Sequence, residues 1–271
     1  YSLLASPIEI AEELNKQLFC KIKLIILTSA TLSTNNNFDF IRSRLGIKEC
    51  RELLLGSPFN YKENVLLYLV KKVADPSDDF EKFQKQVLSH IKELIDIMQG
   101  RTFILFTSYK MLKTIYDELK LNYQGINLLK QGDQPRYDLL GNFKRNMNSV
   151  LLGTNTFWQG VDVPGKALEC VVITKLPFSA PDDPMTEARM ELIESRNGNA
   201  FLEYQVPQAI MMFKQGFGRL IRTKSDRGIV AVLDPRVTTR TYGKSFLNVL
   251  PKCKYTSDIN DVKSFFNVKT N

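Results

Sequence analysis

Three side chains within residues 215–222, Gln-Gly-Phe-Gly-Arg-Leu-Ile-Arg, are suited to binding phosphate. Gln215, Arg219 and Arg222 are spaced i, i+4 and i+7, so a helix would direct all three to one side. Arginine donates paired bonds to phosphate and, as an arginine finger, neutralises charge that develops on a γ-phosphate. Alternatively, the arginines simply favour the carboxyl end of a helix. The two glycines favour the functional reading, because each costs a helix about 1 kcal/mol and a close approach to a ligand or neighbouring domain would offset that cost.

A second segment, residues 153–165, contains three glycines and the only tryptophan of the chain. Glycine lets the backbone approach a ligand closely, and the Thr154 hydroxyl can bond to phosphate. Asp162 can accept a hydrogen bond from a sugar hydroxyl. Phe157 and Trp158 can stack on bases or can instead pack in the core, and the sequence leaves both alternatives open.

One apparent phosphate-binding motif lies inside this region. Gly160, Gly165 and Lys166 fit G-x-x-x-x-G-K, but Ala167 stands where Ser or Thr would hold Mg²⁺. A phosphate loop runs from a strand into a helix, whereas this segment leads into the apolar run at residues 170–173. We therefore exclude it as a Walker A motif, and the sequence contains no other match.

The composition indicates a folded protein with a basic surface. Apolar residues make up 44% and charged residues 24%, and 37 basic residues against 29 acidic ones give a net charge of +8. Such a charge attracts polyanions, most often nucleic acid. No apolar run approaches the roughly 18 residues of a membrane span, so we expect no membrane partner. The start has no signal-peptide pattern and no initiator Met, which fits a piece of a longer protein.

The cysteine and histidine positions argue against a metal site. Four cysteines lie far apart without C-x-x-C spacing, so zinc or iron–sulfur ligation is not expected, and scattered reduced thiols suit the cytoplasm. His90 is the only histidine and lies in a helical pattern, which favours a structural role.

Apolar strands alternate with amphipathic helices along the chain. One apolar stripe with helical spacing consists of Phe80, Phe83, Val87, Ile91, Leu94 and Met98. Fully apolar strands between such helices indicate an α/β fold, a RecA-like, doubly wound, mostly parallel sheet with helices on both faces. The strands are expected at residues 21–27, 64–70, 102–106, 126–129, 150–152, 170–173 and 229–233.

Sites in such sheets lie at the carboxyl ends of the strands. Thr107, Ser108 and Tyr109 follow one expected strand, and residues 153–165 follow another. Their positions increase the weight of a functional interpretation for both loops.

Four segments in series resemble the helicase motifs of superfamily 2, in the DinG branch related to XPD. The resemblance covers nearly the whole chain, and branch-like features are the Trp158-Gln159-Gly160 run, Leu176-Pro177-Phe178 and Gly-Arg-Leu-Ile-Arg. In chain order, motifs III, IV, V and VI would be residues 28–32, 104–109, 153–165 and 215–222.

This resemblance implies two RecA-like domains that clamp ATP with Mg²⁺, while single-stranded DNA crosses both. By this resemblance, Gln215, Arg219 and Arg222 reach the triphosphate, Asp162 contacts the ribose, and Thr107, Ser108 and Thr154 hold DNA phosphates. We accordingly expect further nucleotide contacts from Gly160 and Gln159, and further DNA contacts from Tyr109, Phe157 and Trp158. The residues expected to couple the two sites are Thr28, Ser29, Ala30 and Thr31.

The resemblance also implies the domain organisation. Residues 1–56 would supply the terminal strand and helix of the first motor domain, and residues 57–271 would form the second. The Walker A lysine, the DEAH-type acid and any iron–sulfur cysteines would precede Tyr1. Gln159 departs from the family pattern, because an acidic residue is common there.

These inferences predict the second motor domain of an ATP-dependent DNA helicase, moving 5′ to 3′ by family resemblance and acting in DNA repair or replication. The chain alone is expected to be inactive. One alternative is a single-stranded nucleic-acid binding module without motor function, possibly tethered to a nuclease; another is a scaffold that uses its basic face for protein contacts.

Overall fold

The computed structural model describes residues 5–29, 32–33, 37–158, 163, 165–179 and 183–267. These residues belong to two compact units. One consists of Tyr1–Gly56 with Phe178–Met211, and the other of Ser57–Pro177 with Met212–Asn271.

The second unit is built on a seven-stranded parallel sheet with the strand order β3-β4-β2-β5-β6-β1-β7. Every residue of β1, β2, β4, β5 and β6 is buried, whichever face of the sheet it points to, so both faces are covered along these strands. This confirms the predicted α/β class. The strands are β1 (Val65–Leu69), β2 (Thr102–Leu105), β3 (Asn127–Lys130), β4 (Ser149–Gly153), β5 (Cys170–Ile173), β6 (Gly228–Val232) and β7 (Lys254–Thr256).

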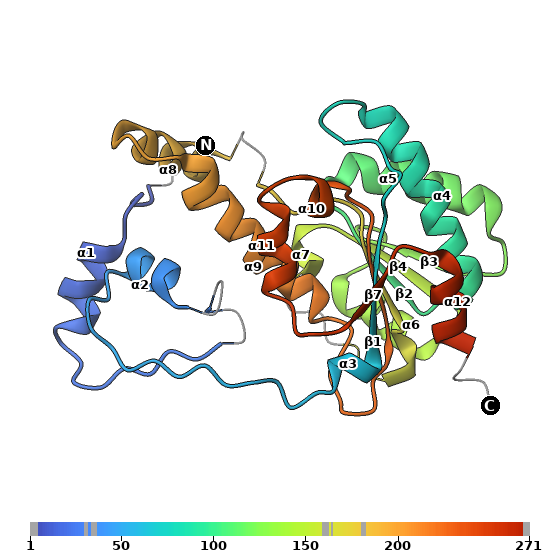
Figure 1. Cartoon of the computed structure of the whole chain (residues 1–271), viewed down its shortest axis with the longest axis horizontal. Coiled ribbons are helices and arrows are strands. Elements are labelled where there is room, and N and C mark those ends of the chain that lie inside the picture. Colours follow the sequence, from blue (N-terminus) through green and yellow to red (C-terminus); the bar gives the residue numbers. More distant parts are fainter. Residues whose placement is uncertain are drawn as a thin grey trace. The chain divides into compact units, whose positions relative to one another are not determined.

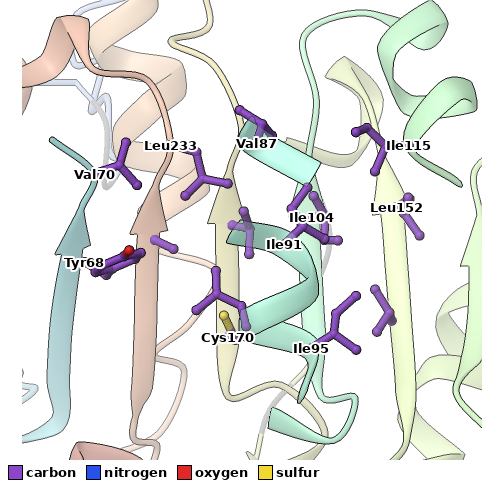
Figure 2. Close-up of a cluster of buried hydrophobic side chains, with 14 of the residues drawn as sticks. Tyr68, Val70, Val87, Ile91, Ile95, Ile104, Ile115, Leu152, Cys170 and Leu233 are labelled. Carbon is purple, nitrogen blue, oxygen red and sulfur yellow. The ribbon is translucent and has the colours of Figure 1, made fainter. Parts of the chain in front are cut away.

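One face of the sheet packs against α4 (Phe80–Met98), α5 (Tyr109–Asn122) and α12 (Ile259–Asn267). Five of the six residues of the predicted stripe of α4 are buried, whereas Phe80 at the start of the helix is 39% exposed. Figure 2 shows Ile91 directed toward the strands that carry Ile104 and Cys170. Asp79 begins this helix by accepting a hydrogen bond from the Lys82 N–H at 2.9 Å.

The opposite face is covered by helices that Figure 1 shows on the other side of the sheet, among them α10 (Arg236–Thr239) and α11 (Gly243–Asn248). Phe213 of α9 (Val206–Phe217) meets Phe246 of α11 edge to face at 5.4 Å. The shorter elements of this unit are α3 (Tyr61–Asn64), α6 (Arg136–Arg145), α7 (Asn155–Trp158) and η2 (Gly165–Ala167).

The first unit is helical in its described part. It contains α1 (Ala11–Leu14), η1 (Asn15–Phe19), α2 (Asp39–Leu45), α8 (Pro184–Ser195), η3 (Phe201–Gln205) and the start of α9. Helix α2 ends at Gly46, which adopts a left-handed φ of 71°.

The prediction of a buried strand at residues 21–27 is wrong for this structure. No strand forms there, and Leu24 and Ile26 are 76% and 78% exposed. A strand must pair its backbone with a neighbouring strand, and the described residues of this unit form no sheet that could accept one. Within the described ranges, no helix is long and apolar enough to cross a membrane.

Candidate nucleotide and nucleic-acid site

The loops after β2 and β4 leave the sheet side by side. These strands are hydrogen-bonded neighbours, with Leu105 opposite Gly153, and the Phe106 N–H donates to the Gly153 carbonyl at 2.9 Å. The segments that resemble motifs IV and V therefore emerge at adjacent strand ends.

The first of these loops leads directly into α5. The Ser108 hydroxyl accepts a hydrogen bond from the Met111 N–H at 3.2 Å and so caps the helix. Tyr109 is 47% exposed, and its hydroxyl lies 3.4 Å from the Gln131 carbonyl. Thr107 is half-buried beside them. Ser108 thus has a structural task that the sequence did not indicate.

Gln131 organises the second loop and was missed from the sequence. Its Oε1 accepts hydrogen bonds from the Thr154 N–H at 2.6 Å and from the Thr154 hydroxyl at 3.0 Å. Its Nε2 donates to the Thr156 hydroxyl at 3.2 Å. The only sequence signal was its position directly after β3, the neighbour of β4.

Phe157 and Trp158 belong to the core. Their side chains are 2% and 0% exposed, so neither ring offers a face on which a base could stack. The Trp158 indole N–H donates to the Phe106 carbonyl at 3.0 Å. Phe157 packs edge to face on Phe103 at 6.3 Å. The packing alternative fits this structure, and the assignment of these two rings to DNA stacking does not.

The same packing explains two glycines. A Cβ on Gly216 would lie 2.9 Å from the Trp158 ring, and one on Gly153 would lie 2.6 Å from the Cβ of Phe157. Since such distances are too short for any side chain, glycine is required for packing at both positions. For Gly216, the close approach that we expected is made to a ring of the same unit.

The prediction that one helix carries Gln215, Arg219 and Arg222 is wrong. Helix α9 ends at Phe217, and both arginines lie in the turns that follow. Gly216 and Gly218 weaken the helix there because glycine has a low helix propensity. Gly218 is the first residue after the helix. The i, i+4, i+7 argument therefore does not set the direction of the arginines.

A hydrogen bond to another element holds Arg219, whereas the amide oxygen of Gln215 has no such contact among the described residues. The Arg219 Nε donates to the main-chain carbonyl of Trp158 at 2.9 Å, joining the end of α9 to α7. The Gln215 Oε1 is buried without a hydrogen-bond partner among the described residues. A buried amide oxygen in this state is costly unless water or a ligand supplies a donor.

Residues 91–253 match the family model described as the helicase C-terminal domain. The chain belongs to this family.

Three similar proteins support the assignment to this family. The ATP-dependent DNA helicase YoaA of Haemophilus influenzae is 37% identical, over 99% of this chain and 42% of that protein. The ATP-dependent DNA helicase DinG of Photobacterium profundum is 37% identical, over 94% of this chain and 38% of that protein. The 3′-5′ exonuclease DinG of Bacillus subtilis is 38% identical, over 92% of this chain and 28% of that protein. The predicted DinG-type resemblance is confirmed, and the chain spans less than half the length of these relatives.

Solved structures support the fold of this helicase C-terminal domain. An XPD helicase aligns with a TM-score of 0.68 at 19% identity, covering 92% of this chain and 45% of that one. An apo XPD structure aligns with a TM-score of 0.67 at 18% identity, covering 92% and 52%. Together with the parallel sheet, these likenesses confirm the RecA-like fold.

The last motif of the helicase C-terminal domain is held by an aspartate that the sequence did not single out. The Asp226 Oδ2 accepts from the N–H groups of Arg222 and Thr223, both at 2.7 Å. Its Oδ1 accepts from the Thr223 hydroxyl at 2.7 Å and from the Gly165 N–H at 3.2 Å. Burial raises the pKa of this carboxyl, but the hydrogen bonds outweigh it and hold the pKa below the ordinary value.

Several predicted site residues of this helicase C-terminal domain chain lie outside its described part, and two others belong to the first unit. Ala30, Thr31, Gln159, Gly160 and Asp162 are outside the described residues. Thr28 and Ser29 are exposed and belong to the unit that contains Tyr1–Gly56.

Within the described ranges of the helicase C-terminal domain, no group of three or more His, Cys, Asp or Glu side chains is placed to hold a metal ion. All four cysteines are free thiols, and burial raises the pKa of Cys170 to about 12, which leaves that thiol protonated and unreactive.

Proposed function

We propose that this chain carries the second motor domain of an ATP-dependent DNA helicase. One observation carries the proposal: buried Trp158 links all three motif segments of this unit. Its indole N–H bonds to Phe106 before the first loop, and its own carbonyl receives Arg219. A rigid link between a DNA-facing strand end and an arginine is what a motor needs to relate DNA contact to nucleotide chemistry.

The proposed DNA surface consists of the two adjacent strand ends. Thr107, Ser108 and Thr154 carry hydroxyls there, and Tyr109 is exposed beside them. Hydroxyl and backbone donors suit phosphate oxygens, which every sequence offers, so binding would be independent of base order. The net charge of +8 would draw a single strand to this surface.

The proposed nucleotide contacts come from Gln215, Arg219 and Arg222. Arginines stabilise charge that grows on the transferred phosphoryl group, while Mg²⁺ would neutralise the β- and γ-phosphates. The unsatisfied Gln215 Oε1 is an acceptor that a phosphate oxygen cannot satisfy, so we assign to it a water molecule of the nucleotide site as donor, while the amide Nε2 is the group that can donate to a phosphate. Asp162, Gly160 and Gln159 remain proposed contacts to the nucleotide.

The first motor domain is the proposed partner. Residues 1–56 would complete it and residues 57–271 would form the second domain, with Thr28, Ser29, Ala30 and Thr31 coupling the two sites. Exposed Leu24 and Ile26 support this, because an apolar segment without a sheet gains stability when it is added to one. The free thiols are compatible with the cytoplasm, where we place the protein.

A second candidate function is a DNA-binding module that lacks motor activity and serves a nuclease. It is favoured by the Bacillus subtilis relative, which is named a 3′-5′ exonuclease and is 38% identical over 92% of this chain.

The deciding experiment uses the full-length protein with duplexes that carry either a 5′ or a 3′ single-stranded tail. The helicase proposal predicts DNA-stimulated ATP hydrolysis and separation of the 5′-tailed duplex. Tight DNA binding without ATP hydrolysis would favour the nuclease-associated module. Separation of only the 3′-tailed duplex would contradict the direction of movement and leave the motor assignment standing.

A further inference from the structure

We propose that Asp226 is a positioning residue that fixes the main chain at Arg222 and thereby positions the arginine side chain to reach the nucleotide. The inference rests on the proposed function, in which Arg222 reaches the triphosphate. It goes further by naming the group that fixes the main-chain position of Arg222.

The need for such a group follows from the end of α9 at Phe217. Backbone hydrogen bonds to the last turn of the helix continue only as far as Leu220, and β6 does not begin until Gly228. Arg222 lies between these two elements. A finger must meet a phosphoryl group within a fraction of an ångström, so its backbone has to be held by other contacts.

Asp226 supplies those contacts through both carboxylate oxygens. Oδ2 receives the N–H groups of Arg222 and Thr223, and Oδ1 receives the Thr223 hydroxyl. Oδ1 also receives the N–H of Gly165, at the end of the segment that resembles motif V. The carboxylate therefore ties the arginine segment to a second loop of the proposed nucleotide site.

The chemistry of the cluster requires a carboxylate. All four partners are donors, and an ionised carboxylate is a pure acceptor with room for four hydrogen bonds. Asparagine has nearly the same shape, but its amide nitrogen would face N–H or O–H donors on one side. Asp226→Asn therefore removes half of the cluster while changing little volume.

A merely structural role predicts a different outcome. Asp226 is buried, so its replacement is also expected to lower stability. Lower stability alone reduces the fraction of active protein in any background, whereas a positioning role acts only through Arg222. A double-mutant cycle separates the two, because residues that act as one unit are not additive.

The experiment uses full-length protein and measures DNA-stimulated ATP hydrolysis for Asp226→Asn, Arg222→Ala and the double variant. The matched control is Tyr123→Phe, which removes a hydroxyl that bonds to the Lys92 carbonyl and the Asp96 carboxylate in the α4–α5 layer. Thermal melting of each variant reports the loss of stability.

We expect Asp226→Asn to lower kcat about 10- to 100-fold with little change in the KM for ATP, since a displacement near 1 Å costs on the order of 100-fold. Tyr123→Phe should keep kcat within about two-fold despite a lower melting temperature. In the Arg222→Ala background, Asp226→Asn should add almost nothing.

Multiplicative losses in the double variant, or a normal kcat for folded Asp226→Asn, would overturn the inference while leaving the proposed function intact. A normal kcat for Arg222→Ala would instead overturn the proposed contact of Arg222 with the nucleotide, on which the inference rests. Should Asp226→Asn fail to fold, Thr223→Val decides: it removes the hydroxyl, which bonds to Asp226 and to Ser225, and keeps the main-chain bonds to Asp226. The inference then requires a reduced kcat at unchanged KM.

Discussion

The guanidinium Nε of Arg219 lies 2.9 Å from the main-chain carbonyl oxygen of Trp158. Because the Trp158 ring is completely buried and bonded through its N–H to Phe106, this carbonyl is held in place by the core itself. The position of Arg219 is thus set by packing rather than by a helix.

Trp158→Ala should destabilise the chain by about 3–5 kcal/mol, because it empties a large buried site. Urea unfolding measures this loss. Trp158→Phe, which keeps an aromatic ring but leaves the Phe106 carbonyl without its donor, should cost less. If Trp158→Ala keeps its stability while losing oligonucleotide affinity, the ring is a stacking platform and our placement of it in the core is wrong.

The two loop hydroxyls should behave differently from each other. Thr154→Ala is expected to weaken oligonucleotide binding with stability nearly unchanged, because its main-chain bond to Gln131 remains. Ser108→Ala should weaken binding and also cost about 1 kcal/mol of stability, since it removes the cap of α5. Fluorescence anisotropy at two salt concentrations and thermal melting are the measurements. Unchanged affinity in both variants, with the parent chain binding DNA, would place the DNA path elsewhere.

His90 should make stability depend on pH. Burial lowers its pKa below the ordinary 6.5, and the nearby Glu93 only partly opposes this shift. The folded chain therefore binds the proton more weakly than the unfolded chain. Stability from this group is complete above pH 6.5 and decreases as the pH falls toward the lower folded value. Melting temperatures between pH 5 and 7.5 should show this slope, and His90→Gln should reduce it; equal slopes in both proteins would disprove the prediction.

The sequence predicted six of the seven strands because they are short, mostly apolar and separated by strong helical stripes, as in β2 and α4. It missed β7, whose Lys254 and Tyr255 are exposed at the sheet edge and lack an apolar pattern. It also placed a strand at residues 21–27, since an apolar run indicates burial without showing that a neighbouring strand is present.

The sequence singled out the loops of the candidate site but did not indicate their internal contacts. The pairing of β2 with β4 brings two of these loops to adjacent strand ends. The roles of Gln131 and Asp226 depend on hydrogen bonds between residues distant in sequence, which no local pattern reveals. Likewise, the glycines near Arg219 suggested a ligand, whereas Gly216 in fact makes room for Trp158.

The central claim is that Arg222 acts on the nucleotide. The most direct measurement is DNA-stimulated ATP hydrolysis by full-length Arg222→Ala, with nucleotide affinity and melting temperature measured on the same preparation. We predict a loss in kcat of about 1,000-fold or more, with ATP affinity and stability much less affected, because a finger meets charge that grows in the transition state. Near-normal turnover in a variant that melts early would show Arg222 to be a structural residue and would contradict the claim.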